Sequence, residues 1–343
     1  LTSCGSGDDP KVVLYCGVDQ DQSQRIADLF QQQTGVPVDF HGETEAMRSI
    51  GLPQRLMDER ERPRADVYWS NEIMHMVDLA LNDVLDPLPE GLAEEFPEAW
   101  RDPDGRFIQF GARARVLMVN LRLLPDPKEH PKRVADLLDP KWNEQGLFAC
   151  MAAPLTGTTY THAVAWLTQD EDGARAFFEQ AAKLGHEGKL KVVASNGRAM
   201  REVSVTGGKV AFCMTDTDDA WIAIQRAESD PDKYDPVLVI YPDQGEADAG
   251  AVLIPNTAAL VRGRRHPEAA ETLLRWLATP ETELTLAEGP SAQIPVRPGV
   301  GPVPDHVKVP GKDFRAARVD WMAVGRNANR WHDWLTTLFR PAN

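Results

Sequence analysis

Five short polar segments of this chain hold most of the side chains whose types and spacing could do chemistry. Each follows an apolar run and precedes a helical pattern, and their ranges are 17–19, 70–72, 155–158, 195–197 and 215–219. In an open α/β sheet, ligands bind beyond the carboxyl ends of the strands, where helix N-termini point. Three segments carry carboxylates, which attract a metal ion or an amine. The other two carry hydroxyls, an amide and glycine without an acidic residue, which suits hydrogen-bond donors around an anion.

Helix capping is the structural alternative for each of these polar residues, because Asp, Ser, Thr and Asn are preferred N-caps. For Asp219 we expect capping, whereas for Asp19, Glu72 and Asp218 the sequence supports ligand binding and capping equally. The last segment concentrates three carboxylates, and their repulsion in a closed site needs a cation or protons to relieve it. We therefore predict that this segment supplies the charge that selects the ligand.

No common catalytic motif supports an enzyme. The patterns GxxxxGK[ST], GxGxxG, GxSxG and HExxH are absent, and the eight histidines have no metal-binding spacing. We expect no catalytic residues. The rival hypothesis is a metal-dependent hydrolase that uses Asp19, Glu72 and Asp218 as acid, base or metal ligands, since carboxylate-only sites leave no motif.

Length and charge restrict the class of protein further. The chain has 343 residues, 42% of them hydrophobic, which is enough for two domains. Its formal charge of −15 argues against nucleic acid or an anionic bilayer face as the main partner. No apolar stretch approaches the roughly 18 residues that span a bilayer.

The order of apolar patterns predicts an α/β fold. A run at 12–15 is followed by a helical pattern that ends at Gly35 and by a second run at 36–40, which together make a βαβ unit with parallel strands. Long helical stretches at 266–277 and 313–339 close the chain. The other predicted strands are 65–69, 116–119, 147–151, 190–194 and 210–214. Every one of them except 116–119 precedes a predicted helix, and these helices begin at about 73 or cover 158–167, 198–206 and 220–228.

The four cysteines have no zinc-binding spacing. Cys4 lies in Leu-Thr-Ser-Cys-Gly, which resembles a bacterial lipobox, and the chain begins with Leu as if a signal peptide had been removed. This resemblance implies that Cys4 is lipidated and that residues 5–10 are a tether. Cys16, Cys150 and Cys213 lie in apolar segments and are expected to be buried thiols, with a Cys150–Cys213 disulfide left open.

Four segments in order, 13–19, 30–38, 65–72 and 134–142, resemble bacterial extracellular solute-binding proteins of the ferric-iron-binding group of ABC importers. The resemblance implies a two-lobed type II periplasmic binding protein, with mixed, mostly parallel sheets, two crossing strands and a ligand in the cleft. It implies a first lobe of residues 10–112 and 246–304 and a second lobe of residues 113–245 and 305–343.

The resemblance also implies site residues. The first iron ligand of the family aligns with Asp19 of this chain. The glutamate of the family's iron site aligns with Asn71 or Glu72. The family's Tyr pair falls on Thr217 and Asp218, so the phenolates are absent. The candidate ligand-binding residues are therefore Asp19, Asn71, Glu72, Asp216, Asp218 and Asp219. The candidate anion-binding residues are Thr156, Gly157, Thr158, Asn196, Arg113 and Arg115.

The leading functional hypothesis is a lipid-anchored, extracytoplasmic, monomeric receptor that binds a small solute and delivers it to an ABC permease. Hard oxygen donors favour Fe(III) or another hard metal ion as cargo, with a phosphate or carbonate-type anion, and no resident cofactor is expected. An organic zwitterion such as an aminophosphonate, or a polyamine, is the alternative cargo.

Overall fold

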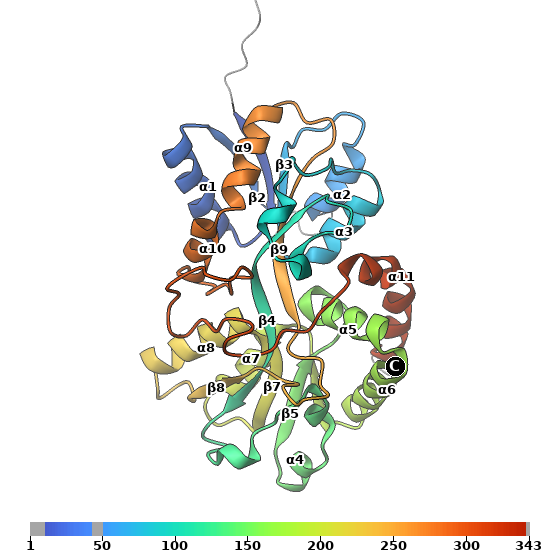
Figure 1. The fold of residues 1–343 in the computed structure, drawn as a ribbon. Coiled ribbons are helices and arrows are strands. Elements are labelled where there is room, and N and C mark those ends of the chain that lie inside the picture. The colour runs from blue at the N-terminus through green and yellow to red at the C-terminus, as the bar shows by residue number, and fades with distance from the viewer. Residues whose placement is uncertain (1–10, 43–50, 341–343) are drawn as a thin grey trace, which may run out of the picture. The chain divides into compact units, whose positions relative to one another are not determined.

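The computed structural model describes residues 11–42 and 51–340, and its chain divides into two compact units (Figure 1). Unit 1 comprises Leu1–Gly111, Pro255–Thr285 and Val296–Gly301. Unit 2 comprises Ala112–Ile254, Leu286–Pro295 and Pro302–Asn343. Each unit is thus assembled from three separate stretches of chain.

Unit 1 contains a mixed sheet in the strand order β2-β1-β3-β9. β1 pairs with β2 and β3 in parallel, and β9 pairs with β3 antiparallel. The strands are β1 (Val12–Gly17), β2 (Val38–Gly42), β3 (Val67–Ser70) and β9 (Leu253–Leu260). The helices are α1 (Gln20–Thr34), α2 (Gly51–Asp58), α3 (Ile73–Leu81), α9 (Pro267–Leu277) and α10 (Pro280–Ala287), with 3₁₀ turns at Ala93–Glu95 and Glu98–Trp100.

The first βαβ unit forms where the sequence predicts it. α1 buries Ile26, Ala27 and Phe30, which recur at helical spacing. The helix ends at Gly35, whose φ of +73° is the left-handed C-cap conformation, and its N–H donates to the carbonyl of Gln31. A glycine at this position makes the turn into β2 possible at no steric cost.

Unit 2 contains strands in the order β4-β7-β5-β6, with β8 paired to β4. β5 runs parallel to β6 and β7, whereas β4 is antiparallel to β7 and β8. The strands are β4 (Ile108–Asn120), β5 (Phe148–Ala152), β6 (Leu190–Val193), β7 (Val210–Asp216) and β8 (Val237–Ile240). The helices are α4 (Lys141–Glu144), α5 (Gly157–Gln169), α6 (Glu171–His186), α7 (Asn196–Ser204), α8 (Thr217–Ser229) and α11 (Trp321–Leu338), with 3₁₀ turns at Pro127–Glu129 and Val134–Leu138.

These strands and helices confirm the α/β fold class with mixed, mostly parallel pairing. β4 and β9 are the two strands that continue from one unit into the other, since the unit boundaries fall after Gly111 and after Ile254. Residues 246–254 and 286–295 belong to unit 2. Ala251 pairs there with Ala316, and Ala112 pairs with Ile294.

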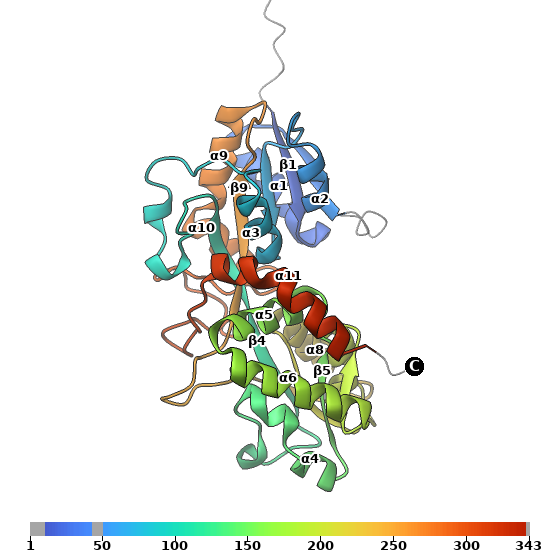
Figure 2. The ribbon, with the colours of Figure 1, turned by 90° about the vertical axis from the view of Figure 1, so that its right-hand side faces the viewer.

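The last helix is shorter than the sequence predicts. The pattern suggested a helix over 313–339, but α11 begins at Trp321. Asp320 caps the helix by accepting from Ala323 N over 2.9 Å, and the preceding stretch is not helical and pairs at Ala316 with Ala251. Within unit 2, α11 packs on α5 and α6 (Figure 2). Tyr160 of α5 donates to the carbonyl of Ala328 in α11.

Cys16, Cys150 and Cys213 are buried, as the sequence predicts. Cys150 and Cys213 are register partners on β5 and β7 without being joined, and burial raises the pKa of Cys150 to about 12. Cys4 lies outside the described residues. In the part of the chain that the structure describes, no helix combines the length and apolar character needed to span a bilayer.

Candidate functional site

The junction of β7 and α8 in unit 2 brings three carboxylates together. β7 ends at Asp216 and α8 begins at Thr217, so the predicted polar loop 215–219 is instead a direct strand-to-helix junction. Asp218 and Asp219 therefore lie in the first turn of α8, where the helix dipole favours negative charge. One carboxylate oxygen from each of the three Asp residues lies within 4.8 Å of the others.

Asp216 is held in a closed hydrogen-bond network. Arg115 Nη1 donates to Asp216 Oδ1 over 2.5 Å, and Thr158 Oγ1 donates to Oδ2 over 2.5 Å. Asn196 Nδ2 donates to the same Oδ2 over 3.2 Å. Thr159 closes the network, because its Oγ1 accepts from Arg115 Nη2 over 3.1 Å and donates to Asn196 Oδ1 over 2.8 Å.

This network is buried, with Arg115 fully enclosed and Asp216 only 3% exposed. Burial alone would raise the pKa of Asp216, but Arg115, Arg113 and the hydrogen bond from Thr158 outweigh it and hold the pKa below its usual value. Asp216 is therefore a permanent anion whose charge Arg115 compensates.

The other two carboxylates of the junction differ from Asp216. Burial, reinforced by repulsion from Asp216 and Asp219 and opposed by Arg113, raises the pKa of Asp218 to about 7. Burial and the charge of Asp216 raise the pKa of Asp219 to about 6. Arg113 Nη1 lies 3.7 Å from Asp218 Oδ2, and Asp219 Oδ2 accepts from Thr215 Oγ1 over 2.9 Å. The capping interpretation of Asp219 is wrong, because Asp216 occupies the N-cap position.

Two neighbours of the network were missed from the sequence. Thr159 follows Thr158 in α5, and His162 lies one turn after Thr158. Burial and the charge of Arg115 lower the pKa of His162 to about 3, so its ring is neutral, and its buried Nδ1 has no hydrogen-bond partner among the described residues. The spacing of Thr158 and His162, four residues apart on one helical face, was the available signal.

Two predicted anion-binding residues lie outside the network. Thr156 is the N-cap of α5 and makes no side-chain capping bond, and Gly157 follows it with a φ of +58°. Both are exposed, whereas Thr158 is 3% exposed. The predicted Thr-Gly-Thr element thus contributes only its last residue to the network.

The candidate residues of unit 1 lie at the carboxyl edge of its parallel strands. Gly17 of β1 is the register partner of Ser70 of β3, so Asp19 and Asn71 follow neighbouring strands. Asp19 is the exposed N-cap of α1 and makes no side-chain capping bond. Glu72 is the N-cap of α3, also without a side-chain capping bond, and its N–H donates to Ser70 Oγ over 3.0 Å.

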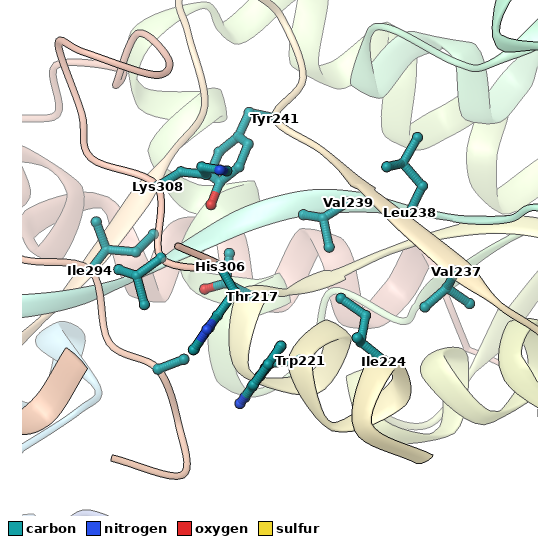
Figure 3. Close-up of a pocket in the computed structure, with 12 residues that line it drawn as sticks. Thr217, Trp221, Ile224, Val237, Leu238, Val239, Tyr241, Ile294, His306 and Lys308 are labelled. Atoms are coloured by element: carbon teal, nitrogen blue, oxygen red, sulfur yellow. The ribbon is translucent and has the colours of Figure 1, made fainter. Parts of the chain in front are cut away.

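An apolar pocket of about 230 Å³ lies beside the first turn of α8 within unit 2 (Figure 3). Trp221 of α8 stacks on His306 with ring centroids 3.7 Å apart and planes 1° apart. Thr217 lines the pocket, and its Oγ1 accepts from Ala114 N over 3.2 Å. The remaining lining is mostly aliphatic and comes from β8 and the segments around Ile294 and Val307. The start of α8 is thus fixed by apolar packing as well as by the polar network.

Comparison with known proteins defines the class. Residues 25–312 match the family model described as bacterial extracellular solute-binding protein. The chain belongs to this family, which confirms the resemblance seen in the sequence. The family is one of solute-binding proteins and not of enzymes.

Two relatives of similar length are named as iron-binding proteins. The major ferric iron-binding protein of Neisseria meningitidis serogroup A is 23% identical over 295 residues, covering 84% of this chain and 82% of that protein. The Fe(3+)-binding periplasmic protein of Serratia marcescens is 22% identical over 314 residues, covering 91% and 86%.

Solved structures share the fold. Iron-bound HitA from Pseudomonas aeruginosa superimposes with a TM-score of 0.77 at 21% identity, covering 95% of this chain and 99% of that one. Ferric iron-binding protein A from Mannheimia haemolytica in an open conformation gives a TM-score of 0.77 at 15% identity, covering 96% and 98%. These likenesses establish the two-lobed fold of these binding proteins.

Proposed function

We propose that this protein is the extracytoplasmic receptor of an ABC import system and that its cargo is ferric iron or another hard cation. The observation that carries the proposal is the cluster of Asp216, Asp218 and Asp219, whose oxygens lie within 4.8 Å of one another. The names of the iron-binding relatives support the same cargo.

The chemistry of the cluster favours a hard cation. Its ligand atoms are carboxylate oxygens, without thiolate or imidazole, and such oxygens suit Fe(III), Ca²⁺ or Mg²⁺ better than zinc or copper. Because Arg115 compensates Asp216, the charges left are Arg113, Asp218 and Asp219, which leave one negative charge in excess. The raised pKa values of Asp218 and Asp219 indicate that this excess is held by protons until a cation replaces them.

We propose further candidate ligand residues in unit 1. Asp19, Asn71 and Glu72 lie at one edge of its sheet, which is the edge where ligands of such sheets bind. Their carboxylate and amide oxygens are donors that a hard cation prefers.

The organic zwitterion is a weaker candidate. Its anionic group would need the donors Thr158 and Asn196, and both already donate to Asp216. We therefore put forward no second cargo.

Binding of cargo is tested with protein purified without chelators. Native mass spectrometry is expected to show one bound metal ion, and titration with ferric nitrilotriacetate is expected to reload metal-free protein at a ratio of one. Zn²⁺ offered at the same concentration is the control and is expected to bind more weakly. Absence of any metal and of any binding heat would contradict the proposal, and hydrolysis of a phosphate-ester substrate by loaded protein would favour the enzyme instead.

Membrane anchoring through Cys4 is a separate part of the proposal and rests on the sequence motif. Labelled palmitate is expected to enter the full-length precursor in a bacterial host and not its Cys4→Ala variant. Equal labelling of both proteins would contradict lipid anchoring through Cys4 and would leave the proposed binding function unaffected.

A further inference from the structure

The side chains around Asp216 come from three different elements of unit 2, and Asp216 itself comes from a fourth. Arg115 lies on β4, Thr158 and Thr159 lie in the first turn of α5, and Asn196 is the first residue of α7. Asp216 itself is the N-cap of α8. The N-termini of three helices, each at least nine residues long, therefore meet at one buried carboxylate.

The surroundings of Asp216 carry more positive charge than an Asp–Arg ion pair needs. A single Asp compensates the full charge of Arg115, but each helix N-terminus adds a partial positive charge. Three donors, Arg115, Thr158 and Asn196, also converge on its two oxygens. Convergent donors at helix N-termini are the usual construction of a site for a small oxyanion.

We propose that Thr158, Thr159, Asn196 and Arg115 form an oxyanion pocket that the protein fills with its own carboxylate, Asp216. The side chain acts as a built-in anion. Three residues of the anion site predicted from the sequence, Thr158, Asn196 and Arg115, would then hold this internal carboxylate instead of a free anion.

A consequence for cargo follows, and it rests on the proposed function. Asp216 occupies the donors that a free anion would need, so cargo binding in this unit needs no free phosphate or carbonate. Capture of the cation is then independent of which oxyanions the surroundings contain.

The pocket is tested first without cargo. Asp216→Ala removes the carboxylate and leaves room for an ion of its size, so 100 mM formate is expected to raise the thermal midpoint of this variant by about 2–4 °C. Asp216→Asn keeps the volume but not the charge, so it leaves no room and formate is expected to leave its midpoint unchanged. Asp219→Ala, outside the donor set, and sodium chloride at equal ionic strength are the controls, with no shift expected.

A folded Asp216→Ala protein whose midpoint formate does not move would overturn the proposal. An equal shift in Asp219→Ala would do the same, because the effect would then be general. Where Asp216→Ala does not fold in plain buffer, its refolding yield with and without formate is measured, and failure in both buffers also counts against the pocket.

The second test uses cargo and separates this inference from the proposed function. Wild-type affinity for Fe³⁺ supplied as the nitrilotriacetate chelate is expected to change less than 2-fold when carbonate and phosphate are removed, whereas the affinity of Asp216→Ala is expected to rise at least 10-fold on adding formate. A wild-type protein that binds iron only with added carbonate or phosphate would overturn the built-in anion. A protein that binds no iron at all would overturn the proposed function and leave the formate result standing.

Discussion

The carboxyl edges of the parallel strands in the two units carry similar polar residues, but these residues differ in burial and in hydrogen bonding. In both, polar residues follow parallel strands and begin helices. In unit 1, Asp19 is exposed and neither it nor Glu72 makes a side-chain capping bond. In unit 2, Asp216 is buried and hydrogen-bonded to three side chains.

The difference follows from β4. This strand brings two guanidinium groups, Arg113 and Arg115, to the edge of unit 2, and both are at most 9% exposed. A buried cation makes a buried carboxylate favourable, and further donors can then be organised around it. Position at a helix N-terminus alone therefore does not determine whether an Asp is solvated or part of a network.

The largest effect is expected from Asp216→Asn. Removal of the charge leaves Arg115 buried without its partner, so the free energy of unfolding should fall by about 3–5 kcal/mol. Urea denaturation measures it. Glu171→Gln, which breaks an exposed pair with Arg330, is the control and should cost less than about 1 kcal/mol. Equal costs would show that the network of unit 2 is no stronger than a surface pair.

The pH dependence of cation binding is expected to be the next largest effect. Cations bind the ionised carboxylates, so pKa values of about 7 for Asp218 and about 6 for Asp219 predict that affinity falls roughly 100-fold from pH 7.5 to 5.5. Calorimetric titration with Tb³⁺, a hard oxygen-seeking probe, measures it.

The stability of the unliganded protein should change in the opposite direction. Because folding raises these two pKa values above 3.8, the folded state binds more protons between about pH 4 and 7, and their contribution is lost as pH rises through the folded pKa values. The double variant Asp218→Asn, Asp219→Asn should remove both dependences. A wild-type pH profile that the double variant retains would place the titrating groups elsewhere.

A smaller effect is expected from Asp218→Asn alone. The substitution keeps the size of the side chain and removes a charge, so cation affinity should fall about 10-fold while the free energy of unfolding changes by less than about 1 kcal/mol. Asp232→Asn, at an exposed position, is the matched control. An unchanged affinity would place the charge of Asp218 outside the binding site.

The smallest effect on stability is expected from Asp19→Asn in unit 1. Its side chain is exposed and makes no capping bond, and Asn is as good an N-cap as Asp, so the free energy of unfolding should change by less than about 0.5 kcal/mol. Cation affinity, measured by the same calorimetry, should fall about 3-fold or more, as the proposed ligand role of Asp19 requires. No loss of affinity would remove Asp19 from the candidate ligands.

Most of the fold could be predicted because it depends on local patterns. The apolar run before Gly17, the helical face ending at Gly35 and the strand before Thr215 all form as their periodicity indicates. The start of α11 could not be predicted, since residues 313–320 have a pattern compatible with helix but Ala316 among them pairs instead with Ala251. Tertiary pairing overrides local propensity there.

The candidate site was predictable in its members but not in its connections. Thr158, Asn196 and Asp216 could be selected because each lies where a strand gives way to a helix. That they bind one another depends on Arg115, which is 101 residues away from Asp216 in the chain. Thr159 was missed because nothing local distinguishes a hydroxyl that turns toward Arg115 from one that faces solvent.

The division of each unit into three stretches has a consequence for synthesis. β9 covers the open edge of β3, yet Pro255, where unit 1 resumes, is made about 140 residues after Gly111, which takes roughly 7–30 s of translation. During that interval the nascent chain carries an unpaired strand edge, the feature that most promotes intermolecular pairing. The sheet of unit 1 is therefore completed only late in synthesis, when β9 pairs with β3.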